Sequence, residues 1–356
     1  MHHGSTSYCL ASDGIVINFA WRTFIWNNEA AEKAHVHCVI VGFSRDDSTP
    51  KYIYDGDDNR TEVSHINGYL IDAIDVFIDS RSKALCEVPE ISIGNQPIDD
   101  GNYIFTQEEA DEFIEKEPKA RAYFRPLFGA TEFLKGTKRF CLWLGDCNPV
   151  DLIKMPLCLD RVKKVKEFRS KSNRTSTKKL AERPTHFQVE SMPDTDFILV
   201  PRHSSENRAY IPMGFMRPDA IATDATLIIP NAKLFHFGVL ESSVHMSWMR
   251  VVAGRIKSDY RYSKDIVYNN FVWPEADDAM KQKISKTAQG ILDARAKYPE
   301  ATLGQMYSNL DLFTDPKRAH QANDKAVLEA YGLKADTSES DIVAHLFRLY
   351  EEKAGA

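Results

Sequence analysis

Two apolar, β-branched runs near the start of the sequence restrict what this chain can fold into. The runs are GIVINFAWRTFIW (14–26) and AHVHCVIVGF (34–43), and a polar connector at 27–33 separates them. Runs of this length and composition predict an antiparallel strand pair. Because an isolated strand pair is marginally stable in water, we expect residues 14–45 to complete a larger sheet.

Further strands are predicted by short apolar runs bounded by turn residues. The region from Ser44 to Asn102 is rich in Asp, Asn, Gly and Pro, and it should be mostly loop. Within it, KYIYD (51–55) and IDVFI (74–78) predict short strands. Four more strands are predicted at DFILVPR (196–202), RAYIPMGF (208–215), ATLIIPN (225–231) and KLFHFGVL (233–240).

Helices are predicted between these strands and throughout the last quarter of the chain. Thr106 and Glu109 have the spacing of a capping box, which predicts a helix that ends near Pro118. Apolar residues recur near the helical period over 149–171. Other predicted helices span 242–256, 277–299, 319–333 and 338–354. The pattern therefore predicts a mixed α/β fold with a helical C-terminal region.

Charge is distributed unevenly along the 356 residues. The net charge is −6, yet Arg161–Arg183 contains ten Lys and Arg against two Glu, a local charge of about +8. Such a basic segment inside an acidic protein is the electrostatic footprint of phosphate contact. The alternative is a solvated, highly charged helix.

Several kinds of site are not indicated by the sequence. No two glycines lie two residues apart, so G-x-G fingerprints for dinucleotides or S-adenosylmethionine are missing, and no cysteines form C-x-x-C. His35 and His37 are expected to pack rather than bind metal, and Asp55–Asn59 is expected to be a turn. No base can be named beside Cys141 or Cys147. Without a long apolar run or secretory signal, we expect a cytoplasmic protein with no membrane partner.

Long stretches of the sequence resemble the MmeI-like family of site-specific adenine DNA methyltransferases of restriction–modification systems. The resemblance covers about residues 14–350, and its strings are long and idiosyncratic. They include VPEISIGNQPIDDGNYIFT (88–106), FRPLFGATEFLKGTKRFCLWL (124–144), DTDFILVPRHSSENRAYIPMGF (194–215) and KTAQGILDARAKYPEATLGQMY (286–307).

The resemblance implies three parts: the last strands of a methyltransferase core (1–45), a target-recognition domain (46–273) and a C-terminal helical domain (274–356). The family's S-adenosylmethionine motif and its N-P-P-Y motif are missing from this sequence. The implied function is sequence-specific recognition of double-stranded DNA, with methyl transfer by a catalytic core in cis or in trans. Two alternatives stay open: a complete enzyme with an unrecognised site, and a structural or interaction fragment.

The segment GRIKSDYRYS (254–263) is a candidate for reading bases. If it is extended, Lys257, Asp259 and Arg261 share one face and the intervening residues share the other. Lys and Arg donate to guanine and Asp accepts from cytosine, so this strip is chemically matched to a G·C pair. Residues alone would favour a surface ion-pair ladder. The resemblance favours base reading, because base specificity varies in this part of the family's recognition domain.

The resemblance also implies a second base-reading couple. Arg202 and Asp224 look like partnered residues for another base pair, and Ala225 with Arg261 would constrain a neighbouring position. The basic segment would position the DNA, since phosphate contacts fix register without reading sequence. The phosphate-contact candidates in it are Lys163, Lys166, Lys171, Arg174 and Lys178.

Overall fold

The two N-terminal runs form an antiparallel pair within a larger sheet, as expected. In this computed structural model, which describes residues 14–26, 36–47, 49–56, 59–256 and 258–355, the sheet order is β2-β1-β3-β4. The strands are β1 Val16–Trp26, β2 Val36–Ser44, β3 Lys51–Asp55 and β4 Asn59–Val63. β3 runs parallel to β1, and β2 forms one edge. A small core forms beneath them from Ile17, Ala20, Ile53 and Ile66.

The strand predicted at 74–78 is absent, and this prediction was wrong. Val76 and Ile78 are buried in the main core, as their apolar side chains require. Their backbone joins no ladder, and the Ile78 amide donates to the Tyr69 hydroxyl at 3.4 Å. An apolar run is therefore buried here as an extended loop.

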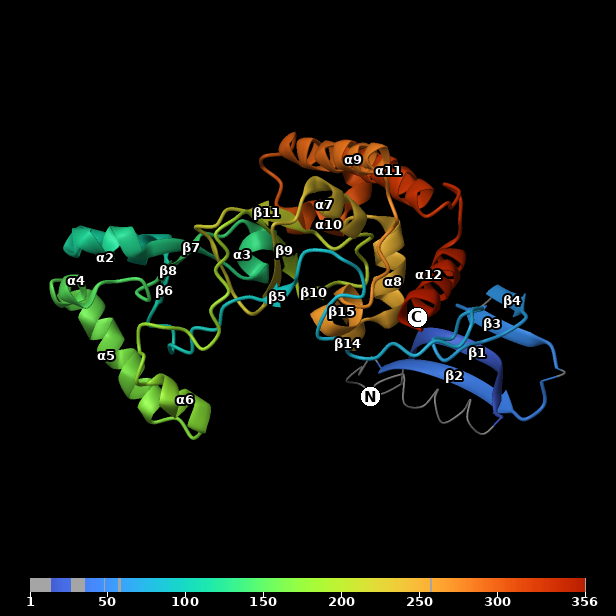
Figure 1. Ribbon diagram of the computed structural model, residues 1–356, viewed down its shortest axis with the longest axis horizontal. Helices are drawn as coiled ribbons and strands as arrows, with labels where there is room; N and C mark the ends of the chain where they lie inside the picture. The colour runs from blue at the N-terminus through green and yellow to red at the C-terminus, as the bar shows by residue number, and fades with distance from the viewer. Residues whose placement is uncertain (1–13, 27–35, 48, 57–58, 257, 356) are drawn as a thin grey trace.

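A second sheet and a group of helices form the lobe at the left of Figure 1. The sheet order is β12-β7-β8-β6. Its elements are β6 Ile104–Thr106, α2 Gln107–Lys116, a 3₁₀ turn at Pro118–Tyr123, β7 Phe124–Phe128, α3 Ala130–Lys135, β8 Arg139–Leu142 and β12 Ile221–Ala222. The predicted capping box of Thr106 and Glu109 begins α2.

The basic helix predicted over 149–171 is interrupted. It consists of α4 Pro149–Ile153 and α5 Pro156–Ser170, and α6 Thr175–Leu180 follows. The break occurs at Pro156, which lacks an amide hydrogen and begins a new helix at its first position. The continuous apolar period did not reveal this break.

The centre of the molecule contains two further sheets. One has the order β11-β9-β13-β5, with the fully buried strand β9 in an interior position. The other has the order β10-β15-β14. The strands are β5 Ser92–Ile93, β9 Phe197–Pro201, β10 His203–Ser204, β11 Gly214–Met216, β13 Thr226–Pro230, β14 Gly254–Ile256 and β15 Asp259–Arg261.

The run KLFHFGVL, predicted as a strand, is the helix α7 Leu234–Leu240. Its last four residues are all buried, and the helix packs against α9. A short, continuously apolar run has the same appearance in a buried strand and a buried helix, so its tertiary surroundings decided the outcome. The helix predicted over 242–256 is present as α8 Ser243–Val252, but the last three residues of that range form the strand β14 instead.

The C-terminal region is helical, as predicted, and the mixed α/β fold is confirmed. Its helices are α9 Asp278–Ala296, α10 Leu303–Ser308, α11 Thr314–Ala330 and α12 Glu339–Ala354. They share one large core with the central sheets, so both regions are packed together. Within the part of the chain that the structure describes, no helix is long and apolar enough to cross a bilayer.

Candidate nucleic-acid interface

Arg202 and Asp224 are neighbours in the fold. Arg202 follows β9, and Asp224 lies in the turn before β13, the strand that pairs with β9. The Arg202 amide donates to the Ala225 carbonyl at 3.2 Å, and its Nη1 donates to the Asp224 carbonyl at 2.9 Å. The turn is therefore attached to Arg202 by both backbone and side chain, and Ala225 is exposed.

The alternation predicted for the 254–263 strip is present only from Asp259 to Tyr262. The strip is not one extended strand, because Gly254–Ile256 are exposed throughout and pair with Asp259–Arg261 as the other strand of a hairpin. Asp259 and Arg261 are exposed, whereas Tyr260 and Tyr262 are 5% and 0% exposed. Lys257 lies outside the described residues. No ion pair joins Asp259 to Arg261 where the structure describes the chain, so the ion-pair ladder gains no support from these two residues.

The strip adjoins the first couple directly. Arg261 on β15 is paired with His203 on β10, the residue after Arg202. The Tyr262 amide donates to the Arg202 carbonyl at 2.8 Å. Arg202 and Tyr262, 60 positions apart in sequence, are thus joined by a backbone hydrogen bond at the end of β9.

Three residues that the sequence did not single out support these candidates. Arg255 on β14 lies 4.3 Å above the Tyr260 ring, donates to the Ser258 carbonyl at 2.9 Å and pairs with Glu206 at 3.7 Å. The Glu206 amide in turn faces the Asp259 carboxylate at 3.4 Å. The third is Gln96, whose amide nitrogen donates to Oδ2 of Asp224 at 2.9 Å. Only contacts across the fold identify these residues.

The interface carries an excess of positive charge near its middle. Burial lowers the pKa of His203, and the neighbouring Arg202 and Arg261 lower it further, so this imidazole is neutral at pH 7. Burial also lowers the pKa of Arg208, which remains a cation. Among the described side chains, Nε of Arg202 and Nε of Arg208 are buried without a hydrogen-bond partner. Each of these two arginines therefore has one donor that is both unsatisfied and shielded from solvent.

The five phosphate-contact candidates are all exposed on α5, α6 and the connection between them. Lys171 pairs with Glu167 at 2.6 Å, and nearby Lys164 pairs with Asp160 at 2.8 Å. Both are exposed pairs one helical turn apart, which contribute little and leave the cations available to a polyanion.

Arg169 lies within the basic segment in sequence, but it is not part of the exposed surface of that segment. It is fully buried, and its guanidinium donates to five carbonyls. The acceptors are Pro97 at 2.7 Å, Ile98 and His186 at 2.9 Å, Arg183 at 3.1 Å and Leu180 at 3.2 Å. This arginine therefore ties α5 to the segment that follows Gln96.

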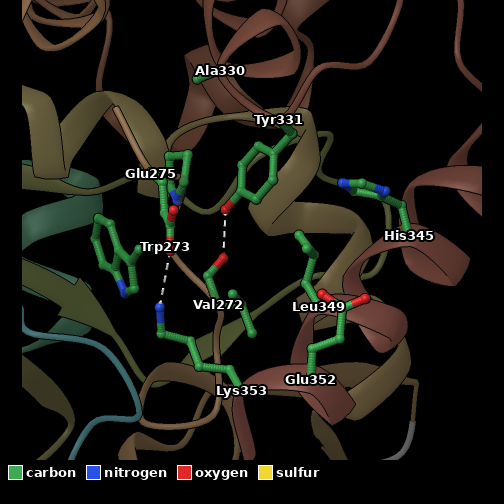
Figure 2. A pocket seen from close by; sticks show the side chains of 10 residues that line it. Val272, Trp273, Glu275, Ala330, Tyr331, His345, Leu349, Glu352 and Lys353 are labelled. Atoms are coloured by element: carbon green, nitrogen blue, oxygen red, sulfur yellow. Dashed lines mark hydrogen bonds and ion pairs between the residues drawn. The ribbon is translucent and has the colours of Figure 1, made fainter. Parts of the chain in front are cut away.

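A separate hollow lies on the C-terminal helices. The hollow has a volume of about 400 Å³. Figure 2 shows the residues that line it. The Tyr331 hydroxyl donates to the Val272 carbonyl at 2.6 Å, and Lys353 Nζ donates to the Glu275 carboxylate at 3.5 Å. None of the predicted base-reading or phosphate-contact residues lines it. In Figure 1, α6 lies at the lower left and β14 and β15 lie just below the centre, whereas α9 and α11 lie at the top of the view. The side chains of His35 and His37 fall outside the described part of the structure.

Comparisons with known proteins cover the whole chain. The model of the MmeI target recognition domain matches residues 72–275, that of the MmeI C-terminal domain matches 276–355, and that of the MmeI DNA-methyltransferase domain matches 7–55. DNA methyltransferase A of Bacillus subtilis (strain 168) is 37% identical over 340 residues, which cover 95% of this chain and 38% of the relative.

A solved structure is also similar over the full chain. The Type IIL restriction–modification enzyme MmeI, solved in complex with DNA, matches with a TM-score of 0.90 and 42% identity. The match covers 100% of this chain and 48% of that enzyme. The present chain thus spans less than half the length of either protein.

Proposed function

Because the chain belongs to the MmeI-type DNA methyltransferases and carries their target recognition region, we propose that it reads a specific double-stranded DNA sequence for adenine-N6 methylation. One observation carries this proposal. Arg202, Asp224, Asp259 and Arg261 come from three separate segments, and backbone hydrogen bonds bring those segments together at the end of β9. Asp259 and Arg261 are exposed and Arg202 and Asp224 are partly exposed, and accessible donors and acceptors on a rigid β framework are what base reading requires.

Each couple is assigned one G·C pair. In the first, Arg202 donates to guanine and Asp224 accepts from the amino group of cytosine. In the second, Lys257 and Asp259 take the same two roles. Arg261 with Ala225 constrains a neighbouring position, where the small Ala225 side chain leaves room for a base edge.

The exposed cations of α5 and α6 are assigned to the phosphate backbone. Lys163, Lys166 and Lys171 are three members of this group, and Arg174 and Lys178 continue it. Exchanging the three lysines together for Met should weaken binding to all sequences alike. The slope of log K against log salt should flatten by roughly 0.9 for each phosphate that the variant no longer neutralises. Weakening confined to one sequence would contradict the positioning role.

Methyl transfer is assigned to a catalytic core, in cis or in trans, that binds S-adenosylmethionine. The β1–β2 pair supports this partner, because it presents large exposed apolar side chains near β2, which is an edge strand among the described residues. They are Phe19, Val39, Ile40 and Phe43, between 40% and 57% exposed. Covering this surface with the remaining methyltransferase domain would bury it.

The first test is selection of bound duplexes from a random DNA pool by the purified chain at a stated salt concentration. Enrichment of one short motif that contains G·C pairs is expected. Exchanging Lys257 and Asp259 together for Glu and Arg should then change the preferred base at one position only. An unchanged motif would refute the assignment of this couple. Absence of enrichment, even after a catalytic core is added in trans, would refute the recognition function.

A further inference from the structure

Gln96 holds the carboxylate of Asp224 from outside both predicted couples. Its Nε2 donates to Asp224 Oδ2 at 2.9 Å, although the two residues are 128 positions apart. We propose that Gln96 is a specificity-positioning residue, which fixes the Asp224 carboxylate in one orientation and thereby sharpens the choice of base at that position. This inference rests on the proposed function and adds a third residue to the Arg202/Asp224 couple.

The main chain around Gln96 is attached to the Asp224 turn. The Asp224 amide donates to the Asn95 carbonyl at 3.0 Å, and the Asn95 amide donates to the Ala222 carbonyl at 2.7 Å. Gly94 continues this contact, and an added Cβ there would overlap the carbonyl of Thr223. The two segments therefore approach as closely as backbones can, and only glycine permits it.

The opposite side of Gln96 is held as well. Its amide donates to the Val189 carbonyl at 3.0 Å, and its carbonyl accepts from the Gln188 amide at 2.8 Å. The Arg169 guanidinium donates to the carbonyls of the next two residues, Pro97 at 2.7 Å and Ile98 at 2.9 Å. The Gln96 backbone is thus fixed on both sides, and its side chain starts from a rigid position.

The chemical consequence concerns the two oxygens of Asp224. The Gln96 amide occupies Oδ2, and no hydrogen bond from the described residues reaches Oδ1. A carboxylate held in this way presents one free acceptor toward a base amino group. Without the Gln96 amide the Asp224 carboxylate can rotate, and fixing its orientation on DNA binding then costs binding free energy. A charge-assisted hydrogen bond of this kind typically changes an equilibrium by about tenfold or more.

The test measures binding of the full chain to four duplexes that differ only at the base pair assigned to Arg202 and Asp224. A catalytic core is added if the chain alone does not bind. Gln96→Leu should reduce discrimination at this pair by about tenfold while leaving discrimination at the Lys257/Asp259 pair unchanged. Gln96→Glu should reduce it further, because two carboxylates then face each other. Gln107→Leu is the matched control, since Gln107 donates to Asp111 Oδ2 at 3.0 Å on α2. It should change nothing.

A double-mutant cycle separates this inference from the proposed function. Asp224→Ala should lower discrimination by itself, and adding Gln96→Leu to it should have no further effect. If Asp224→Ala leaves discrimination intact, the base-reading assignment of Asp224 fails. If Asp224→Ala acts and Gln96→Leu does not, only the positioning role fails. A Gln96→Leu effect that persists beside Asp224→Ala, or that spreads to every base pair, would also overturn it.

Discussion

Replacing Arg169 with Met should destabilise the protein by about 3–5 kcal/mol, although Arg169 lies in the most basic segment of the chain. Its guanidinium makes five hydrogen bonds to carbonyls between 2.7 and 3.2 Å. Methionine leaves these five carbonyls without their donor, and a buried acceptor left unsatisfied costs about 1–3 kcal/mol. With water replacing the donor at some of the five, the loss given above follows.

Lys166 on the same helix is the matched control. It is exposed and three residues from Arg169, and it carries the same charge. Lys166→Met should leave the urea midpoint unchanged and flatten the salt dependence of DNA binding by the equivalent of roughly one phosphate. Arg169→Met should do the reverse, because its charge does not reach the surface.

Two measurements on each variant decide the matter: urea unfolding followed by fluorescence, and DNA affinity over a series of salt concentrations. A destabilisation below about 1 kcal/mol in Arg169→Met would refute the structural role worked out above. A flattened salt dependence with intact stability would show that Arg169 contacts DNA instead.

Two further predictions concern buried charge and acid sensitivity. Arg295 on α9 forms an ion pair with the fully buried Glu241 at 2.7 Å. Burial raises the pKa of Glu241, and the positive charge of Arg295 opposes that rise. Arg295→Met should therefore lower the free energy of unfolding in urea by about 3–5 kcal/mol, because it leaves the Glu241 carboxylate buried without its cation. Adding Glu241→Leu removes that carboxylate and should restore part of the stability. A double variant less stable than Arg295→Met would contradict this reasoning. Burial lowers the pKa of His245 to about 3, against 6.5 in an unfolded chain. The unfolded state takes up the proton first, so the contribution of His245 to stability falls as the pH drops from about 6.5 toward 3, by roughly 2 kcal/mol at pH 5. The pKa values of His236 and His320 are lowered by burial as well, and these residues act in the same direction. His245→Gln should therefore reduce the loss of stability between pH 7 and pH 5 by roughly 2 kcal/mol, and an unchanged loss would exclude His245 as a source.

Local pattern was sufficient for several elements that have one side facing water. The N-terminal strand pair, the Thr106 cap and the last helices followed from periodicity and capping, since these signals depend on residues only a few positions apart. The same reason explains the strip at 259–262. Alternation of two exposed charged residues with two buried tyrosines is a property of an extended chain on a core.

Local pattern failed where burial is complete or where a contact spans the fold. The apolar run at 233–240 became a helix because its neighbours, and not its period, determined how it could be buried. The charge of Arg169 could not reveal that five distant carbonyls enclose it. Arg169 therefore has a structural role within a segment that the sequence predicted to be an exposed basic surface.

The sequence by itself determined the family, the mixed fold class and the residue types suited to a G·C pair, because these are recorded in long strings and in side-chain chemistry. The resemblance implied that Arg202 and Asp224 are partners. Only the tertiary structure decided which hydrogen bonds attach the Asp224 turn and the Arg261 strand to the Arg202 segment, and that Gln96 holds the Asp224 carboxylate. These contacts join segments separated by between 22 and 128 positions. No local propensity encodes such proximity, since it arises only when strands pair and bury their common core.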